Sequence, residues 1–215
     1  MSVQVKICGL STPEAMTAAV EGGAAFVGLV FYPPSPRAVT PAQAAPLAAL
    51  APAGVVKTGL LVDAGDETIA AILKEVPLDL LQLHGSESPQ RVAEVKARFG
   101  LPVMKVVKLR KAGDLEAVQP YLEVADRLLF DAKPPEDMEN PLPGGNAVAF
   151  DWTLLAGTTW PLPWMLAGGL TPENVARAVE ISGAPAVDVS SGVEDAPGRK
   201  NPAKIKAFLE ACRAL

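Results

Sequence analysis

The feature that most constrains this chain is a repeated alternation between short apolar runs and longer segments rich in alanine or charge. Several runs are nearly continuous stretches of Val and Leu, which is typical of parallel strands buried on both faces. We expect eight strands, at residues 3–7, 26–31, 55–62, 80–84, 103–107, 128–131, 164–167 and 186–190.

The segments between these runs carry signals for the start of a helix. A capping Ser, Thr or Asn stands before a proline suited to the first helical position. These pairs are Thr12-Pro13, Thr40-Pro41, Ser88-Pro89, Thr171-Pro172 and Asn201-Pro202. We also expect helices at residues 66–74, at 114–121 and from 152–155 onward.

A strand followed by a helix, eight times in 215 residues, predicts an α/β protein. The expected fold is a single (β/α)8 TIM barrel spanning residues 1–215. An open doubly wound sheet also alternates strands and helices, and it is the alternative. Residues 133–145 are rich in Pro, Glu, Asp and Asn, so we expect a mobile loop after the sixth strand.

Composition narrows the classes of partner. The net charge of −5 argues against a nucleic-acid partner, which favours a basic surface. Cys8 and Cys212 are too few for a disulfide framework, which favours a reduced cytoplasmic protein. The N-terminal residues show no signal-peptide pattern, and no apolar stretch is long enough for a membrane span, so no membrane partner is expected. A monomer and a homodimer remain equally open.

Two glycine loops near the C-terminus predict a phosphate site. Gly168 and Gly169 follow the seventh apolar run, and Ser190 ends the eighth, with Ser191 and Gly192 directly after it. Glycine lets the backbone approach a ligand, and free N–H groups opening a helix bind anions. Loops after the last two strands of a barrel commonly hold phosphate, so we expect a phosphorylated small-molecule substrate.

Alternation along a strand sorts the polar residues at strand ends by face. Lys6 shares a face with Cys8, Gln82 with His84, and Asp188 with Ser190. Polar groups inside a barrel need partners. Because the first and last strands are neighbours in a closed barrel, we predict an interior ion pair between Lys6 and Asp188.

Cys8 and Asp131 are the candidate catalytic groups. Cys8 could accept a proton, because a free thiol has a pKa of about 8.5 and a nearby Lys6 would favour the thiolate. It could equally be a small buried hydrophobe. A carboxyl at Asp131 could act as a general acid if burial raised its pKa, or it could be an ordinary loop carboxylate.

Arg37 and His84 are candidate substrate-binding residues. Three prolines stiffen the loop that carries Arg37, and a rigid arginine at a barrel mouth can grip a carboxylate or phosphate. An ordinary solvated arginine is the alternative. His84, the only histidine, either contacts the ligand or is a structural polar residue. One histidine and two distant cysteines make a poor metal site, and no nucleotide motif is present, so no metal or cofactor is expected.

Several segments together resemble the phosphoribosylanthranilate isomerase family over essentially the whole chain. The most specific are Lys6-Ile7-Cys8-Gly9, Leu81-Gln82-Leu83-His84-Gly85 and Ser190-Ser191-Gly192-Val193-Glu194. Others are Ser35-Pro36-Arg37, Leu129-Phe130-Asp131, Phe150-Asp151-Trp152 and Ala167-Gly168-Gly169-Leu170. The resemblance implies a barrel of the ribulose-phosphate-binding type and an Amadori rearrangement in tryptophan biosynthesis, with no metal or cofactor.

The resemblance also implies residue roles. Asp131 matches the general acid, Cys8 the general base and Arg37 the group facing the anthranilate carboxylate. The backbone at Gly168, Gly169, Ser191 and Gly192 matches the phosphate cradle. The chain departs from the family pattern in its longer loop after Asp131, in Gly144-Gly145-Asn146-Ala147, and in Asn201 where Asp is common.

Three rival functions remain. Another sugar-phosphate isomerase, such as the histidine-pathway enzyme, would be expected to use two aspartates and two phosphate sites. A non-catalytic sugar-phosphate binding barrel would bind ligand without turnover. A thiol redox protein would normally carry a Cys-x-x-Cys motif, which this chain lacks.

Overall fold

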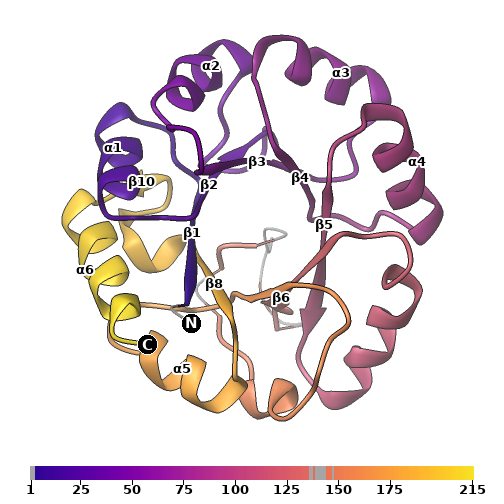
Figure 1. Cartoon of the computed structure of the whole chain (residues 1–215), viewed down its shortest axis with the longest axis vertical. Coiled ribbons are helices and arrows are strands. Elements are labelled where there is room, and N and C mark those ends of the chain that lie inside the picture. Colours follow the sequence, from indigo (N-terminus) through magenta and orange to yellow (C-terminus); the bar gives the residue numbers. More distant parts are fainter. Residues whose placement is uncertain (1–2, 136–137, 139–143, 147) are drawn as a thin grey trace.

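Eight parallel strands form a closed barrel in the order β1 to β8, and helices surround it (Figure 1). The structure is a computed structural model that describes residues 3–135, 138, 144–146 and 148–215. Most of the loop expected at 133–145 therefore lies outside the described residues. The closed barrel confirms the predicted fold class and excludes the open sheet.

The strands of the barrel lie close to the predicted runs. They are β1 (Gln4–Cys8), β2 (Phe26–Val30), β3 (Val56–Leu61), β4 (Leu80–Leu83), β5 (Val103–Leu109), β6 (Arg127–Ala132), β7 (Trp164–Leu166) and β8 (Ala186–Val189). The α-helices are α1 (Pro13–Glu21), α2 (Pro41–Ala49), α3 (Asp66–Glu75), α4 (Pro89–Phe99), α5 (Val175–Ser182) and α6 (Pro202–Arg213). The described residues also form the 3-10 helices η1 (Ala112–Tyr121), η2 (Trp152–Leu155) and η3 (Ser191–Val193).

Side-chain caps start four of the helices where the sequence predicts. The side chains of Thr12, Thr40, Ser88 and Asn201 each accept a backbone N–H from the first turn that follows. The prediction for Thr171 was wrong, because α5 begins at Val175. There the Asn174 side chain accepts from Thr171 N and donates to Gly169 O, which holds residues 171–174 in a turn.

The segment expected to be helical at 114–121 forms η1, a 3-10 helix, and it starts at Ala112. Pro120 lies inside it and has no N–H to donate, which disfavours a regular α-helix. A two-stranded hairpin of β9 (Glu194–Ala196) and β10 (Arg199–Lys200) follows η3 and was not predicted. Gly198 in its turn has a φ of +80°, and a Cβ there would meet the carbonyl oxygen of Pro36.

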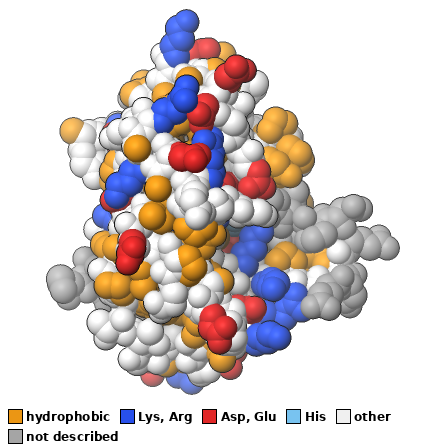
Figure 2. Space-filling model, turned by 90° about the vertical axis from the view of Figure 1, so that its right-hand side faces the viewer, with side chains coloured by type: hydrophobic (Ala, Val, Ile, Leu, Met, Phe, Trp, Pro, Cys, Tyr) orange, Lys and Arg blue, Asp and Glu red, His pale blue; other side chains and the backbone are white. Residues whose placement is uncertain are grey.

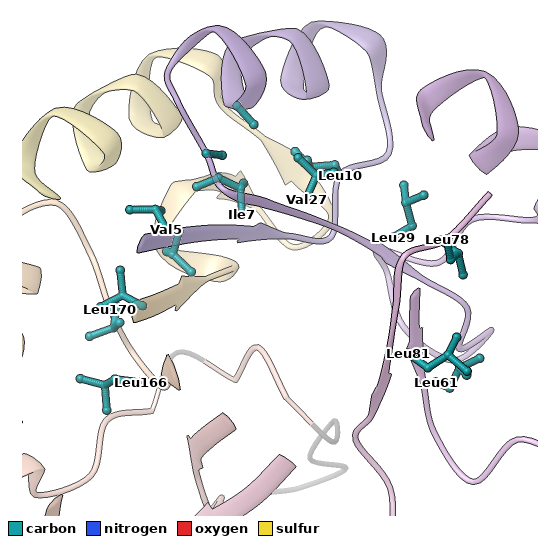
Figure 3. Close-up of a cluster of buried hydrophobic side chains, with 14 of the residues drawn as sticks. Val5, Ile7, Leu10, Val27, Leu29, Leu61, Leu78, Leu81, Leu166 and Leu170 are labelled. Atoms are coloured by element: carbon teal, nitrogen blue, oxygen red, sulfur yellow. The ribbon is translucent and has the colours of Figure 1, made fainter. Parts of the chain in front are cut away.

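The main hydrophobic core lies between the strands and the helices. Alternate strand residues such as Val5, Ile7, Val27 and Leu29 point outward from the barrel and are buried (Figure 3). A second, smaller core fills the barrel interior. It comprises Phe26, Leu80, Met104, Val106, Leu129, Met165, Ala167 and Ala186. Side chains therefore fill the interior of the barrel, and a ligand site is expected at the C-terminal ends of the strands.

Acidic and basic side chains are interleaved on one face of the helical ring (Figure 2). Asp66 of α3 pairs with Arg91 at 2.7 Å and with Arg98 at 2.9 Å, both from α4. Such partly exposed surface pairs contribute little to stability individually. No helix among the described residues is long and apolar enough to cross a membrane.

Candidate active site

One pocket at the C-terminal ends of the strands brings the predicted site residues together. Cys8 from β1 and Asp131 from β6 both line it. The other predicted residues lining it are Arg37, His84, Gly168, Gly169, Ser190 and Ser191. Gly192 lies just beyond the lining, where a Cβ would collide with the carbonyl oxygen of Leu170.

The pocket has an apolar side. Val30, Tyr32, Leu60 and Val62 line it beside Cys8, and these residues form one small hydrophobic cluster with the thiol. Their strands, β2 and β3, follow β1 directly around the barrel. This wall is suited to an aromatic ring, because apolar groups gain from removal from water.

The predicted ion pair between Lys6 and Asp188 is confirmed. Their residues are partners in the β1–β8 register, and Lys6 Nζ donates to Asp188 Oδ1 at 3.0 Å. Lys6 is fully buried beneath Cys8. A Cβ at Gly28 would lie 3.1 Å from Cys8 Sγ and 3.2 Å from Lys6 Nζ, so glycine leaves room for both groups.

Burial raises the pKa of the Cys8 thiol, and the ammonium of Lys6 opposes that rise. For Lys6 itself, burial alone would lower the pKa, but Asp188 and Cys8 outweigh it and the pKa is raised. Lys6 therefore stays charged. The thiol is held mainly protonated at rest, beside a cation that stabilises the thiolate when it forms.

Asp131 is held by two hydrogen bonds. Its Oδ1 accepts from Ala132 N at 2.8 Å, and its Oδ2 lies 3.2 Å from His84 Nε2. The other ring nitrogen of His84, Nδ1, lies 3.2 Å from Gln82 Nε2. Because an amide nitrogen only donates, Nδ1 accepts, so Nε2 carries the hydrogen and donates it to Asp131. His84 thus orients the carboxyl group.

Lys108 is a further cation near Asp131 that the sequence analysis did not single out. The two residues are partners in the β5–β6 register, and neighbours in register share a face of the sheet. Burial lowers the pKa of Lys108, and Asp131 opposes that shift. Strand parity could have identified Lys108, because it lies two positions after Val106 and so shares the face of β5 that points into the barrel.

Arg37 is buried and is held by Glu194. Its Nε and Nη2 donate to the two carboxylate oxygens of Glu194, each at 2.8 Å. Lys200 Nζ donates to the same carboxylate at 2.6 Å. Glu194 is part of the Ser-Gly-Val-Glu motif, but the sequence analysis gave it no role. Its partner Arg37 lies 157 residues away, and no local pattern relates the two positions.

The glycine loops offer free donors. The backbone N–H groups of Gly168, Gly169, Ser191 and Gly192 donate no hydrogen bond within the part of the chain that the structure describes. Gly168 and Gly169 have positive φ values of 89° and 63°, which L side chains rarely adopt. Unpaired N–H groups converging from two loops form an anion-binding concavity.

Side chains that could bind a metal ion do not cluster in the part of the chain that the structure describes. Within the described ranges, no three His, Cys, Asp or Glu side chains lie close enough to hold a metal ion. Both cysteines are free and buried.

Comparisons with known proteins agree with this geometry. A family model described as N-(5'phosphoribosyl)anthranilate (PRA) isomerase matches residues 5–211. The N-(5'-phosphoribosyl)anthranilate isomerase of Paramagnetospirillum magneticum is 62% identical over 99% of this chain and 98% of its own. That of Rhodospirillum centenum is 56% identical over 100% of both chains.

Solved structures give the same answer. Phosphoribosyl anthranilate isomerase from Thermotoga maritima has a TM-score of 0.87 and 36% identity, covering 99% of this chain and 100% of that one. A phosphoribosyl anthranilate isomerase in complex with reduced 1-(o-carboxyphenylamino)-1-deoxyribulose 5-phosphate has a TM-score of 0.83 and 34% identity over the same shares. This chain therefore belongs to the N-(5'-phosphoribosyl)anthranilate isomerase family.

Proposed function

We propose that this chain isomerises N-(5-phosphoribosyl)anthranilate to 1-(2-carboxyphenylamino)-1-deoxyribulose 5-phosphate, an Amadori rearrangement in tryptophan biosynthesis. The observation that carries the mechanism is that Cys8 and Asp131 line one pocket from different strands. A proton acceptor and a proton donor on separate walls are what an aldose–ketose isomerisation requires.

The substrate's two ends match the two ends of the pocket. The phosphate accepts from the free N–H groups at Gly168, Gly169, Ser191 and Gly192. The anthranilate ring lies along the apolar wall of Val30, Tyr32, Leu60 and Val62, and its carboxylate faces Arg37. The ribose then lies between the thiol and the carboxyl group.

The first step is ring opening. Asp131, in its acid form, protonates the furanose oxygen, and the bond between C1 and that oxygen breaks. The nitrogen lone pair forms the C=N bond of a protonated Schiff base. His84 and Ala132 N hold the carboxyl group in place for this transfer.

The second step is proton removal at C2. The Cys8 thiolate takes this proton, and the electron pair of the C–H bond forms the C=C bond of an enolamine as the C=N electrons return to nitrogen. Lys6 stabilises the thiolate. Tautomerisation of the enolamine gives the ketone product. Ring opening takes its proton from Asp131, removal of the C2 proton uses Cys8, and the C–O, C=N and C=C bonds made or broken all lie within the substrate.

Turnover of freshly prepared substrate, followed by the decay of its fluorescence, tests this proposal. We expect Cys8→Ala and Asp131→Asn each to lower kcat by at least about 100-fold, because a positioned acid or base contributes roughly 10²–10⁴-fold. Binding of a reduced product analogue should remain. Cys212→Ser, which removes the other buried thiol, is the matched control for Cys8→Ala and should keep wild-type kcat.

Wild-type-like rates in Cys8→Ala would remove the thiol from the mechanism, and retained activity in Asp131→Asn would move the acid role elsewhere. A folded wild type that binds the analogue without turnover would favour a binding protein. We place the reaction in the cytoplasm, where a free thiol such as Cys8 stays reduced. One similar solved structure, 34% identical, is of monomers generated from the dimeric isomerase of Thermotoga maritima, and for this chain either a monomer or a homodimer is proposed.

A further inference from the structure

Glu194 lies at the centre of a buried cluster of three charges. It accepts two hydrogen bonds from Arg37 and one from Lys200, and the exposed fraction of each of the three side chains is 5% or less. Burial would raise the pKa of Glu194, but Arg37 and Lys200 outweigh it and the pKa is lowered. Glu194 is therefore a carboxylate at neutral pH. Burial lowers the pKa of Lys200 and Glu194 opposes that shift, so the cluster carries a net charge of +1 when Lys200 is protonated and zero when it is not.

The hydrogen bonds of the cluster leave only one edge for a ligand. Lys200 Nζ uses its donors on Glu194 Oε1, on Ser190 O at 2.9 Å and on Ser190 Oγ at 3.2 Å. Arg37 uses Nε and Nη2 on Glu194, and Nη2 also donates to Gly145 O at 3.3 Å. Among the described residues, Nη1 of Arg37 has no partner, and it lies against Gly145 in the pocket lining.

We propose that Glu194 is a positioning residue that makes the pocket selective for a monoanionic carboxylate on the aromatic end of the substrate. It turns the Nη1 edge of Arg37 toward the pocket and balances the positive charge of the guanidinium. This inference rests on the proposed placement of the anthranilate carboxylate at Arg37.

Two physical arguments support this role. A guanidinium held bidentately keeps one orientation, whereas a free arginine must be ordered when the ligand binds. The charge balance also matters, because the Glu194 carboxylate repels a second negative charge on a ligand bound at Arg37, whether or not Lys200, whose pKa burial lowers, keeps its proton. Without that carboxylate the site would accept a dianion such as a phosphonate more readily, so Glu194 acts against the wrong anion as well as for the right one.

The test compares three stable reduced product analogues. One carries the natural 2-carboxylate, one has hydrogen in its place, and one has a 2-phosphonate, which is a dianion at pH 8.5. In Glu194→Gln we expect affinity for the carboxylate ligand to fall about 10-fold or more, with affinity for the unsubstituted ligand unchanged within about twofold. The ratio of phosphonate to carboxylate affinity should rise.

Three further variants locate the effect. Asp195→Asn removes the adjacent exposed carboxylate, which bonds Asn201 and Lys204, and should leave all three affinities unchanged. Arg37→Ala should lose carboxylate affinity. The double variant Arg37→Ala/Glu194→Gln should be no worse than Arg37→Ala, because Glu194 acts through Arg37. In turnover, Glu194→Gln should raise KM with kcat within about threefold.

Several results would overturn the proposal. Equal losses for all three ligands would show a merely structural role, and so would additive effects in the double variant. If Glu194→Gln does not fold, Glu194→Asp keeps the charge but withdraws it by one methylene, and it should reduce carboxylate affinity selectively. Wild-type turnover is measured first, so that its failure, which would refute the isomerase, is distinguished from failure of the selectivity role.

Discussion

Cys8 gains its chemical character from neighbours supplied by other elements of the barrel. Burial and the carboxylate of Asp188 favour the thiol, whereas Lys6 and Lys200 favour the thiolate. The opposed influences leave a thiol that is protonated at rest but has a cation beside it. The thiol is buried, but it lines the active-site pocket, which is the route by which a small reagent would reach it.

Alkylation by iodoacetamide tests the direction of this shift. Because the pKa of Cys8 is raised, the thiolate is a minor species at pH 7, and its fraction rises about tenfold per pH unit below the pKa. We expect the alkylation rate of Cys8 in a Cys212→Ser background to rise steadily from pH 7 to 9 without a plateau. Mass spectrometry of the labelled peptide measures it.

Lys6→Met sharpens the same test. Loss of the ammonium should raise the pKa of Cys8 further and slow alkylation at any given pH. A plateau near pH 7 in the wild type, or unchanged rates in Lys6→Met, would contradict the electrostatic account.

The loops after β7 and β8 are the elements that carry the proposed phosphate site. Gly192 follows Ser191 at the start of η3 and packs against the backbone of Leu170. No side chain fits there, so the close approach of the two loops requires glycine. The cluster of free N–H groups therefore depends on the contact between the two loops, and neither loop forms it alone.

Replacement of Gly192 by alanine should therefore separate the loops. We expect Gly192→Ala to raise KM by about 10-fold or more, because the converging N–H groups would move apart. Gly65→Ala is the control, since a Cβ at Gly65 meets nothing within 4 Å and its φ of −75° suits alanine. Equal KM values in both variants would show that the Gly192 contact does not shape the site.

Pro46 is an anomaly in α2. It lies in the helix interior, where proline removes a backbone hydrogen bond and clashes with the preceding turn, at a cost of about 3 kcal/mol. Its side chain is exposed and is not part of the hydrophobic core, so burial of the ring offsets little of this cost. We expect Pro46→Ala to stabilise the protein by about 2 kcal/mol, allowing ~1 kcal/mol for the greater freedom of the unfolded chain.

Urea denaturation measures the effect of Pro46→Ala. A lower unfolding midpoint in this variant would mean that the proline is favourable where it stands. Catalytic constants should not change, because α2 contributes no residue that lines the active-site pocket.

At the scale of the whole molecule, closure between β1 and β8 depends on a buried ion pair. Lys6 and Asp188 are 182 residues apart in sequence and join the first strand to the last. Removing one partner of such a pair typically costs 3–5 kcal/mol, because it leaves an uncompensated buried charge. Replacing both partners by apolar residues is often nearly neutral.

We expect Lys6→Met to lower the free energy of unfolding by about 3–5 kcal/mol and Lys6→Met/Asp188→Leu to recover most of that loss. Urea unfolding of the two variants and the wild type, monitored by circular dichroism, measures both changes. A double variant as unstable as the single one would mean that the pair is favourable in itself.

The sequence by itself determined the repeating parts of this protein, because their signals are local. Alternating apolar runs identified the strands, and capping side chains before proline identified most helix starts. Strand parity and barrel closure were enough to predict the pair of Lys6 and Asp188, since in a closed barrel the first strand must meet the last. The start of α5 was wrong because the side chain of Asn174 competes for the turn that precedes it.

Only the tertiary structure decided the partners of the site residues. His84 meets Asp131 across 47 residues, and Arg37 meets Glu194 across 157. No period in the sequence relates these positions, because loops and strand ends follow no repeat and long side chains can reach several neighbours. The sequence could identify Arg37 and Asp131 as candidate site residues. Which groups hold their side chains in place depends on contacts that form only when the barrel closes.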